Sequence, residues 1–189
     1  MNRALAKRLR ALESARISST QVTVYRVVPA ACVVGKVSFE HLFTSGQKNR
    51  FNLAGAHALY ASETEALALT EFKANYADLG VDCPDYLCFR IHINLARVLD
   101  LTDPKTAGLL KLQPKSLLSD WKNALRPTVT QQLGTLIDSG VGNFSGVRFQ
   151  SARAAGANIV IYRQRVNPPD IVWPLEDPRK GWPLSAFSP

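Results

Sequence analysis

The segment from His57 to Gly80 constrains the fold most, because it predicts a strand that runs directly into a capped helix. Its first five residues, HALYA, form a short and mostly apolar run, as in a strand. Ser62 is followed three residues later by Glu65, which matches the capping box that begins many helices. The helix is expected to reach about Asp78, and the glycine just beyond it is a typical helix stop.

Glu71 stands out in this helix because its neighbours on the helix surface are largely apolar. Two faces of the helix share this character, one with Ala68, Leu69, Phe72, Tyr76 and Leu79, the other with Leu67, Thr70 and Ala74. A helix that is apolar on two sides is well covered by the rest of the fold. A partly buried carboxylate needs a partner or a function, so the residues leave a structural and a catalytic role for Glu71 open.

Strand and helix patterns are mixed along the chain rather than strictly alternating. This favours an α+β fold with mostly antiparallel or mixed sheets and flanking helices. No GxGxxG or GxxxxGK[ST] motif is present, which disfavours a doubly wound nucleotide fold. Apolar periodicity predicts helices at Asn2–Ala15, Phe39–Phe43 and Thr128–Ser139. Strands are predicted at Val22–Val28, Asp85–Ile93, Arg97–Leu101, Val147–Phe149 and Ala157–Val166.

The chain of 189 residues is long enough for one domain with its own core. We expect a basic N-terminal helix (1–20), a folded domain (21–175) and a proline-rich tail (176–189). A loop is expected to start at Asp103, and residues 106–125 fit no single pattern. The prolines that follow Asn167 exclude a regular helix or a central strand there, and Trp173 and Trp182 could dock parts of this region.

The chain is basic, with a formal net charge of +8, so its surface attracts anions such as phosphorylated molecules or acidic proteins. No zinc-finger, helix-turn-helix or RNP pattern accompanies this charge, so we expect no direct nucleic-acid binding. A non-catalytic module that uses the basic surface to hold nucleic acid or an acidic partner is the alternative to an enzyme. Apolar runs are too short for a membrane span, and the N-terminus lacks a secretory core. The three irregularly spaced cysteines favour a reducing, cytoplasmic compartment, and no metal site is expected.

Two groups of cationic side chains are candidates for binding an anion. Alternation places Arg26 on the valine-rich face of its strand. Because charges are rarely buried alone, Arg26 either pairs with a carboxylate at the sheet edge or reaches into a pocket for an anion. The loop from Lys48 to Asn52 combines two cations and two amides, so it is either a phosphate cradle or a solvated surface loop.

Four segments of the chain, in their order and spacing, resemble the RES domain, a family named for its Arg, Glu and Ser residues. They are Val24-Tyr25-Arg26, Arg50-Phe51-Asn52, Leu59-Tyr60-Ala61-Ser62 followed by Glu71, and Gly146-Val147-Arg148-Phe149-Gln150-Ser151-Ala152-Arg153. The resemblance covers roughly residues 22–166. Proteins of this family are typically toxins of bacterial toxin–antitoxin pairs.

The resemblance implies a fold similar to that of ADP-ribosyltransferase toxins, with NAD+ as a substrate and no cofactor. The nicotinamide–ribose bond would be the bond that is broken. On the same resemblance, Arg26 and Arg50 would hold the pyrophosphate, and Asn52 and Arg153 belong to the substrate-binding set. A permanently charged guanidinium suits this role because it can bind a phosphate through two hydrogen bonds.

The resemblance also assigns roles at the reacting end of the substrate. Tyr60 would stack on or orient the nicotinamide and its ribose, and Ser151 would contact the ribose or a phosphate. Glu71 would bind the ribose hydroxyls and stabilise an oxocarbenium-like centre. The chemistry agrees with a site of one carboxylate, because a cationic leaving group needs no general acid.

The residues leave open whether NAD+ is hydrolysed, phosphorolysed or used to transfer ADP-ribose to a protein. Lys48-Asn49 stands where the family usually has small residues, and Gln150 stands where a proline is common. These positions bear on loop shape and on the choice of acceptor. The family further implies a bacterial cytoplasmic protein whose site is covered by a cognate antitoxin or immunity protein.

Overall fold

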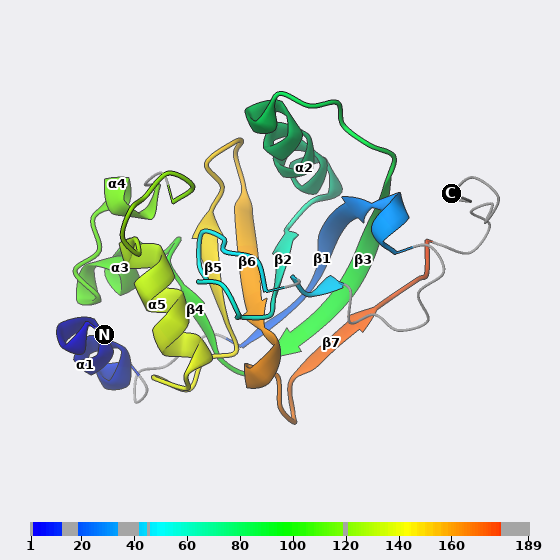
Figure 1. Cartoon of the computed structure of the whole chain (residues 1–189). Helices are drawn as coiled ribbons and strands as arrows, with labels where there is room; N and C mark the ends of the chain where they lie inside the picture. The colour runs from blue at the N-terminus through cyan, green and yellow to red at the C-terminus, as the bar shows by residue number, and fades with distance from the viewer. Residues whose placement is uncertain (1, 13–18, 34–41, 45, 119–120, 179–189) are drawn as a thin grey trace.

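The computed structural model describes residues 2–12, 19–33, 42–44, 46–118 and 121–178, which form a seven-stranded sheet with helices around it (Figure 1). The strand order is β4-β5-β6-β2-β1-β3-β7, and each neighbouring pair is antiparallel except the parallel pair β4–β5. The predicted α+β fold with mostly antiparallel strands is confirmed. The strands are β1 Thr20–Pro29, β2 Ala58–Ser62, β3 Tyr86–Leu95, β4 Val98–Asp100, β5 Gly146–Gln150, β6 Ala157–Tyr162 and β7 Ile171–Pro174.

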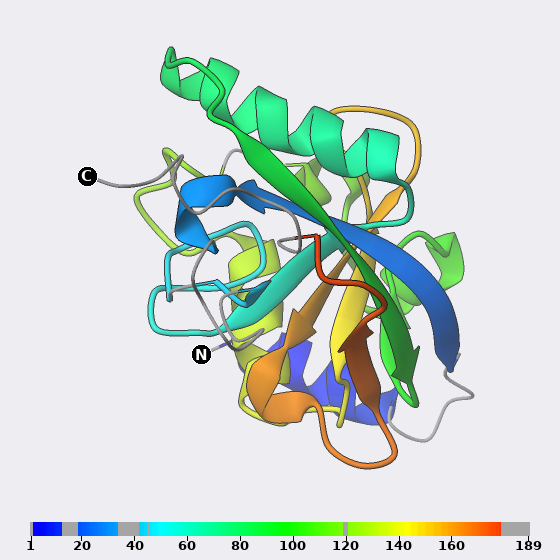
Figure 2. The same ribbon diagram turned by 90° about the vertical axis from the view of Figure 1, so that its right-hand side faces the viewer.

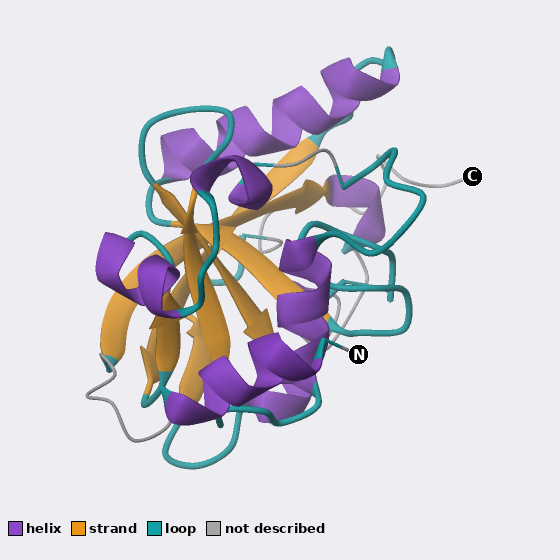
Figure 3. Cartoon of the chain, turned by 90° about the vertical axis from the view of Figure 1, so that its left-hand side faces the viewer, coloured by secondary structure: helices purple, strands orange, loops and turns teal. Residues whose placement is uncertain are grey.

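The helices gather in two places. Figure 1 shows α1, α3, α4 and α5 beside the β4–β5 end of the sheet and α2 above its middle, and Figure 3 shows the first group from its outer side. None of the helices in the described ranges is long and apolar enough to cross a membrane. The helices are α1 Arg3–Ala11, α2 Glu65–Leu79, α3 Pro104–Leu109, α4 Pro114–Leu117 and α5 Val129–Asp138, with 3-10 turns η1 Ala30–Cys32 and η3 Arg163–Arg165.

The core lies on both faces of the sheet, which explains why β6 is apolar on both sides apart from Asn158. All six residues of β6 are buried. Val160 and Tyr162 belong to a cluster with α1 and α5, whereas Ile159 and Ile161 belong to a cluster with β1 and β3. The second cluster joins residues from both ends of the sheet. The sheet is therefore strongly twisted, and Figure 2 shows β1 crossing β2 at a steep angle.

The inward pattern of β3 agrees with the prediction. Leu87, Phe89, Ile91 and Ile93 are all buried, as the alternation in Asp85–Ile93 predicts. The predicted apolar side of α5 is also buried, through Leu133, Leu136 and Ile137. Its N-terminus carries a capping box between Thr128 and Gln131.

Three predicted element ends are wrong. The cap of α2 is Thr64, whose hydroxyl accepts from the Leu67 N–H, while Ser62 is the last residue of β2. The pairing of β2 with β6 thus continues through Ser62, the residue that the capping-box pattern places at the helix cap. Asp103 begins no loop but caps α3, accepting from backbone N–H groups of the first turn. The strand predicted at Ala157–Val166 ends at Tyr162, where the chain turns into η3.

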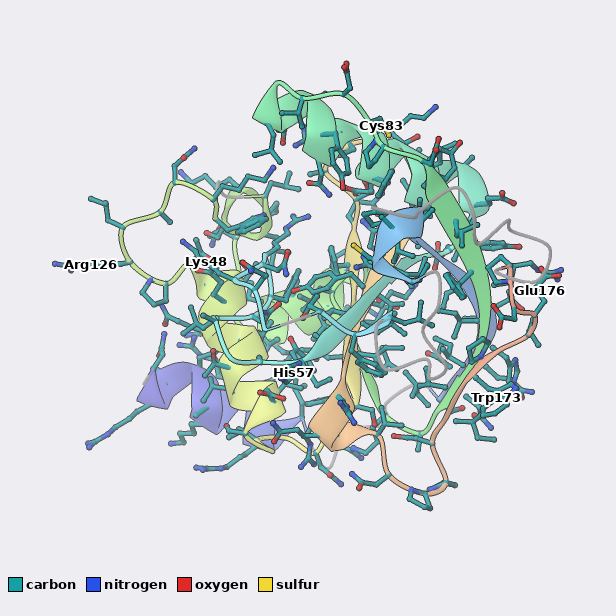
Figure 4. All side chains as sticks on the ribbon, turned by 45° about the vertical axis from the view of Figure 1, so that its right-hand side comes forward. Lys48, His57, Cys83, Arg126, Trp173 and Glu176 are labelled. Carbon is teal, nitrogen blue, oxygen red and sulfur yellow. The ribbon has the colours of Figure 1, made fainter. Side chains whose placement is uncertain are left out.

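Two predictions concern the parts beside the sheet. The predicted short helix at Phe39–Phe43 lies mostly outside the described residues, as does Trp182. Trp173 lies on β7 and is 63% exposed, pointing away from the core (Figure 4), and the tail that it could dock lies mostly outside the described residues. Helix α1 is capped by Asn2, and its Leu5 and Leu9 are buried in the core cluster with α5.

Asp138 destabilises the fold at neutral pH, so Asp138→Asn is expected to raise stability there by about 0.5 kcal/mol. It is the last residue of α5, where the helix dipole disfavours a negative charge, and its Oδ1 is buried without a hydrogen-bond partner. Burial raises the pKa of Asp138, and Arg165 and His57 offset this only in part. A raised carboxyl pKa means that the folded state binds a proton more tightly than the unfolded state.

The gain from Asp138→Asn should therefore be present at neutral pH and vanish as the pH falls below the ordinary aspartate range. Thermal unfolding of both proteins across this pH range measures it. A melting temperature that falls at neutral pH would show that Arg165 stabilises the ionised Asp138 more than burial disfavours it.

Candidate functional site

The loop at Asn49–Asn52 is fixed to the core, although its sequence is also typical of a solvated loop. Asn49 and Asn52 form an isolated β-bridge that closes a tight turn. The carbonyl of Asn49 accepts from the Gln131 amide on α5 at 3.0 Å. The carbonyl of Phe51 accepts from the Tyr162 hydroxyl on β6 at 2.9 Å. Because Gln131 and Tyr162 are both fully buried, these anchors set the loop rigidly against the sheet.

Gly134 lets helix α5 approach this loop closely. A Cβ atom at this position would overlap the carbonyl of Phe51 and press on the Tyr162 hydroxyl. Glycine in a helix interior costs about 1 kcal/mol relative to alanine. The close approach of helix and loop therefore accounts for a residue that helix propensity alone disfavours.

Arg50 extends from this loop across a pair of aromatic rings. Its Cζ lies 5.9 Å from the Phe51 ring centroid and 5.2 Å from that of Phe149. Its Nε donates to the Leu117 carbonyl at 2.9 Å. Burial lowers the pKa of Arg50, and the negative charge of Glu71 opposes this effect. The guanidinium is thus a partly desolvated cation near Glu71, held by a neutral acceptor and by cation–π contacts.

Tyr60 and Asn52 connect the loop to β2. The Tyr60 hydroxyl donates to Asn52 Oδ1 at 2.8 Å and accepts from the Phe51 N–H at 3.0 Å. Asn52 is 1% exposed and donates to the carbonyls of Gln47 and Leu53. Burial raises the pKa of Tyr60 well above its usual range, so the phenol stays neutral. In this structure Asn52 holds the loop and orients Tyr60.

Arg26 lies where β1 separates from β2. The two strands share one register pair, Tyr25 opposite Ser62, and Arg26 is the next residue of β1. Its Nε is buried and has no hydrogen-bond partner. Burial lowers the pKa of Arg26, and the nearby Tyr60 offsets this only in part. Of the two interpretations of Arg26, the ion pair at a sheet edge finds no support in the described part of the chain.

Glu71 points from α2 toward β6 and the end of β5. Its Oε1 accepts from the Ser151 hydroxyl at 2.6 Å and from the Asn158 amide at 2.7 Å. Ser151 Oγ in turn accepts from the N–H groups of Arg153 and Ala154. The partner that a partly buried carboxylate requires is thus a set of neutral donors, and the charge of Glu71 is not cancelled by an ion pair in direct contact.

The start of α2, and with it Glu71, is positioned by an ion-pair network across the sheet. Glu63 accepts from Arg148 Nε at 2.7 Å and from the Ala157 N–H at 3.3 Å. Arg148 also donates to Asp100 at 2.9 Å and to Thr102 at 2.8 Å. The network ties β4, β5 and β6 to the β2–α2 junction.

A cavity of about 330 Å³ lies on the outer side of this network. Its charged lining groups are Glu63, Asp100 and Arg148, and Arg148 forms an ion pair with both carboxylates. Neither Arg26 nor Glu71 lines it. The two carboxylates outnumber the one cation, so the cavity disfavours an anionic ligand, and the chemistry favours the Arg26–Glu71 region over this cavity.

Arg153 is the predicted site residue whose side chain lies apart from the others. Its guanidinium forms an ion pair with Asp78 near the end of α2, and Lys122 Nζ lies 2.8 Å from the same carboxylate. The structure brings together Arg26, Arg50, Asn52, Tyr60, Glu71 and Ser151 through the contacts and charge interactions above. Arg153 reaches this group through its backbone N–H alone.

Asn158 and Ser62 are site residues that the sequence patterns do not single out. Asn158 is 8% exposed in the centre of the sheet, and its Oδ1 accepts from the Ser62 hydroxyl at 2.7 Å. A clue was present in the strand ANIVIY, where an amide interrupts an otherwise apolar buried run. The capping-box pattern places Ser62 at the helix cap, so the sequence does not show that Ser62 belongs to the strand.

The assembled site combines two desolvated cations, a neutral phenol and one carboxylate. Arg26 forms no ion pair with the described residues, and the hydrogen bonds of Arg50 go to a neutral carbonyl, so the two cations favour a ligand with negative charge, such as a pyrophosphate. A single carboxylate beside them can stabilise a developing positive centre. Among the described residues, no group of His, Cys, Asp and Glu side chains is arranged to hold a metal ion.

Comparisons with known proteins agree with this fold. A family model described as the RES domain matches residues 23–178. A chain in the crystal structure of the M. tuberculosis MbcT–MbcA toxin–antitoxin complex superposes with a TM-score of 0.69 at 19% identity, covering 93% of this chain and 91% of that chain. None of the curated proteins compared with the sequence matches it.

Proposed function

Because the chain belongs to the RES domain family, we propose that it consumes NAD+ by breaking the bond between nicotinamide and ribose. The observation that carries this proposal is the buried Nε of Arg26, which has no hydrogen-bond partner among the described residues and lies near Tyr60. Tyr60 also interacts with Arg50, which in turn lies near Glu71. A partly desolvated cation without a paired anion costs stability. A bound pyrophosphate would supply the missing anion.

Arg50 supports a ligand of the same charge. It bonds a backbone carbonyl through Nε and also through Nη2, so part of its guanidinium is engaged before any ligand binds. The aromatic pair beneath it, Phe51 and Phe149, has ring centroids 4.4 Å apart and prevents the side chain from collapsing toward the core. We expect Arg50 to act mainly as a fixed positive charge near the phosphates.

Glu71 would act at the ribose. Departure of nicotinamide leaves positive charge on the ribose ring, and an adjacent carboxylate stabilises that charge. Nicotinamide leaves as a neutral molecule, so no acid is needed to protonate it. The neutral Tyr60 phenol is suited to packing against the nicotinamide or its ribose, because its hydroxyl is already held by the Asn52 loop.

We further propose that the chain is a toxin restrained by an antitoxin. The support is the family together with the fold of one chain in the MbcT–MbcA toxin–antitoxin complex, which matches this chain over 93% of its length. An enzyme that depletes NAD+ must be inhibited in the cell that makes it. The expected antitoxin would cover the region around Arg26 and Glu71 and exclude NAD+ from it.

The fate of the ADP-ribosyl group separates three forms of the proposal. Purified protein incubated with NAD+ should yield ADP-ribose if water is the acceptor and a phosphorylated ADP-ribose if inorganic phosphate is. Label transferred from NAD+ to protein in a cell extract would instead identify ADP-ribosyl transfer. Intact NAD+ under all three conditions would overturn the proposed function.

Arg26→Met tests the role of the buried cation. We expect KM for NAD+ to rise about 30-fold or more, because a hydrogen-bonded charge pair in a desolvated site contributes about 2 kcal/mol or more. The free protein should be as stable as the wild type or more stable, because the variant removes an unpaired buried charge. Steady-state kinetics and thermal unfolding measure the two effects.

Arg126→Met is the matched control, because Arg126 is exposed and extends away from the molecule (Figure 4). It removes the same charge and should leave KM within about twofold of wild type. An unchanged KM in Arg26→Met would show that the buried guanidinium does not hold the substrate.

A further inference from the structure

We infer that Asn158 and Ser62 are positioning residues for Glu71, a role that rests on the proposed cleavage of NAD+. The two side chains form a chain of hydrogen bonds that begins at Ser62, passes through the Asn158 amide and ends at Glu71 Oε1. Each of the two steps measures 2.7 Å. Both residues are buried, at 4% and 8% exposure, within adjacent strands of the sheet.

The carboxylate of Glu71 determines the direction in which these hydrogen bonds are donated. An ionised carboxylate only accepts hydrogen bonds, so the Asn158 group that faces Glu71 must be its amide NH2. The carbonyl oxygen Oδ1 must then face the other way, where the Ser62 hydroxyl donates to it. A rotated Asn158 amide would place two acceptor oxygens against each other at the Glu71 end.

The backbone makes this arrangement rigid. Ser62 and Asn158 lie directly opposite each other in the β2–β6 register, so the sheet holds the two side chains in contact. Glu71 comes from a different element, helix α2. The Asn158 amide is therefore a contact through which the central strands set the position of the carboxylate on the helix.

The two carboxylate oxygens of Glu71 differ in the hydrogen bonds that they accept. Asn158 and Ser151 both donate to Oε1, at 2.7 and 2.6 Å. No hydrogen bond reaches Oε2 in the described part of the chain. Holding Oε1 at two points fixes the plane of the carboxylate and leaves Oε2 to face the ribose. Asn158 thus acts through Glu71 and needs no contact with the substrate.

Asn158→Leu tests the inference, because leucine has a similar size and cannot donate to Glu71. We expect kcat for nicotinamide release to fall about 10²-fold, since small displacements of a reacting group have effects of this size. KM should change by less than about threefold, because the cations that hold the pyrophosphate are untouched. A purely structural role would lower the melting temperature without separating kcat from KM.

Ser62→Ala provides a second variant that leaves the core volume almost unchanged. We expect kcat to fall about fivefold in Ser62→Ala, and the double variant with Asn158→Leu to be no slower than Asn158→Leu alone. The effects should not add, because Ser62 acts only through the Asn158 amide. Ser145→Ala is the matched control, since Ser145 is also buried and donates to a side-chain carboxylate, that of Asp170, outside the site.

The outcomes separate this inference from the proposed function. A wild-type protein that releases nicotinamide, with Asn158→Leu slowed in kcat and Ser145→Ala unaffected, supports both. Turnover by the wild type with unchanged kcat in Asn158→Leu would overturn the positioning role alone, as would additive effects of the two variants. Lack of turnover by the wild type, with and without phosphate, would overturn the proposed function and this role with it.

Discussion

Glu71→Gln should lower kcat for nicotinamide release by about 10³-fold or more while the protein keeps its fold. Glutamine can place its carbonyl oxygen where Oε1 accepts from Ser151 and Asn158, so both hydrogen bonds survive. The change removes the negative charge that would stabilise the developing positive centre on the ribose. Rates of nicotinamide release and circular dichroism of the two proteins measure these effects.

Glu176→Gln is the control for this prediction. It removes the same charge at an exposed position just after β7, where Glu176 forms a 3.4 Å surface ion pair with Arg90 (Figure 4). Its activity should equal that of the wild type. Equal activity of the Glu71→Gln variant would show that Glu71 has a structural role, as a buried carboxylate satisfied by neighbouring donors.

Gly134→Ala is expected to destabilise the protein by about 3 kcal/mol or more. The new methyl group would overlap the carbonyl of Phe51, which is backbone and cannot rotate away. Either α5 or the Asn49–Asn52 loop must then move, and the hydrogen bond from Tyr162 to that carbonyl is lost. Thermal unfolding should show a melting temperature lower by roughly 6 °C or more.

The same variant should lose activity at temperatures where it is still folded, because the displaced loop carries Arg50 and orients Tyr60. Gly108→Ala in α3 is the matched control, since a Cβ there meets no atom within 4 Å. It should be neutral or stabilise the protein by up to about 1 kcal/mol. A Gly134→Ala protein with wild-type stability would show that α5 and the loop are less closely packed than described.

Sequence patterns predict the sheet well where one side chain in two is buried. The alternation of Leu87, Phe89 and Ile91 in the sequence predicts which side chains of β3 are buried. The ends of the helices and strands are harder to predict, because the same residues can fit both a capping pattern and a strand pairing. Ser62 fits a capping box, but pairing with β6 continues through it, and Thr64 supplies the cap instead.

The site is predictable only in part, for a similar reason. Residue types single out Arg26 and Glu71, because charges in apolar surroundings are visible in the sequence, and the resemblance to the RES domain adds Arg50 and Tyr60. The anchors of the loop are not visible, since Gln131 and the loop carbonyl of Asn49 are 82 positions apart and meet only after folding. The residue type of Arg153 suits an anion-binding site, but in the structure its guanidinium forms an ion pair with Asp78 instead.

The rate of nicotinamide release from NAD+ by the purified wild-type and Glu71→Gln proteins, measured side by side with and without phosphate, tests the central claim most directly. We predict that the wild type releases one nicotinamide for each NAD+ consumed and that Glu71→Gln releases nicotinamide about 10³-fold more slowly or not at all. No release by the wild type, or equal rates for the two proteins, would contradict the assignment of this site to cleavage of NAD+.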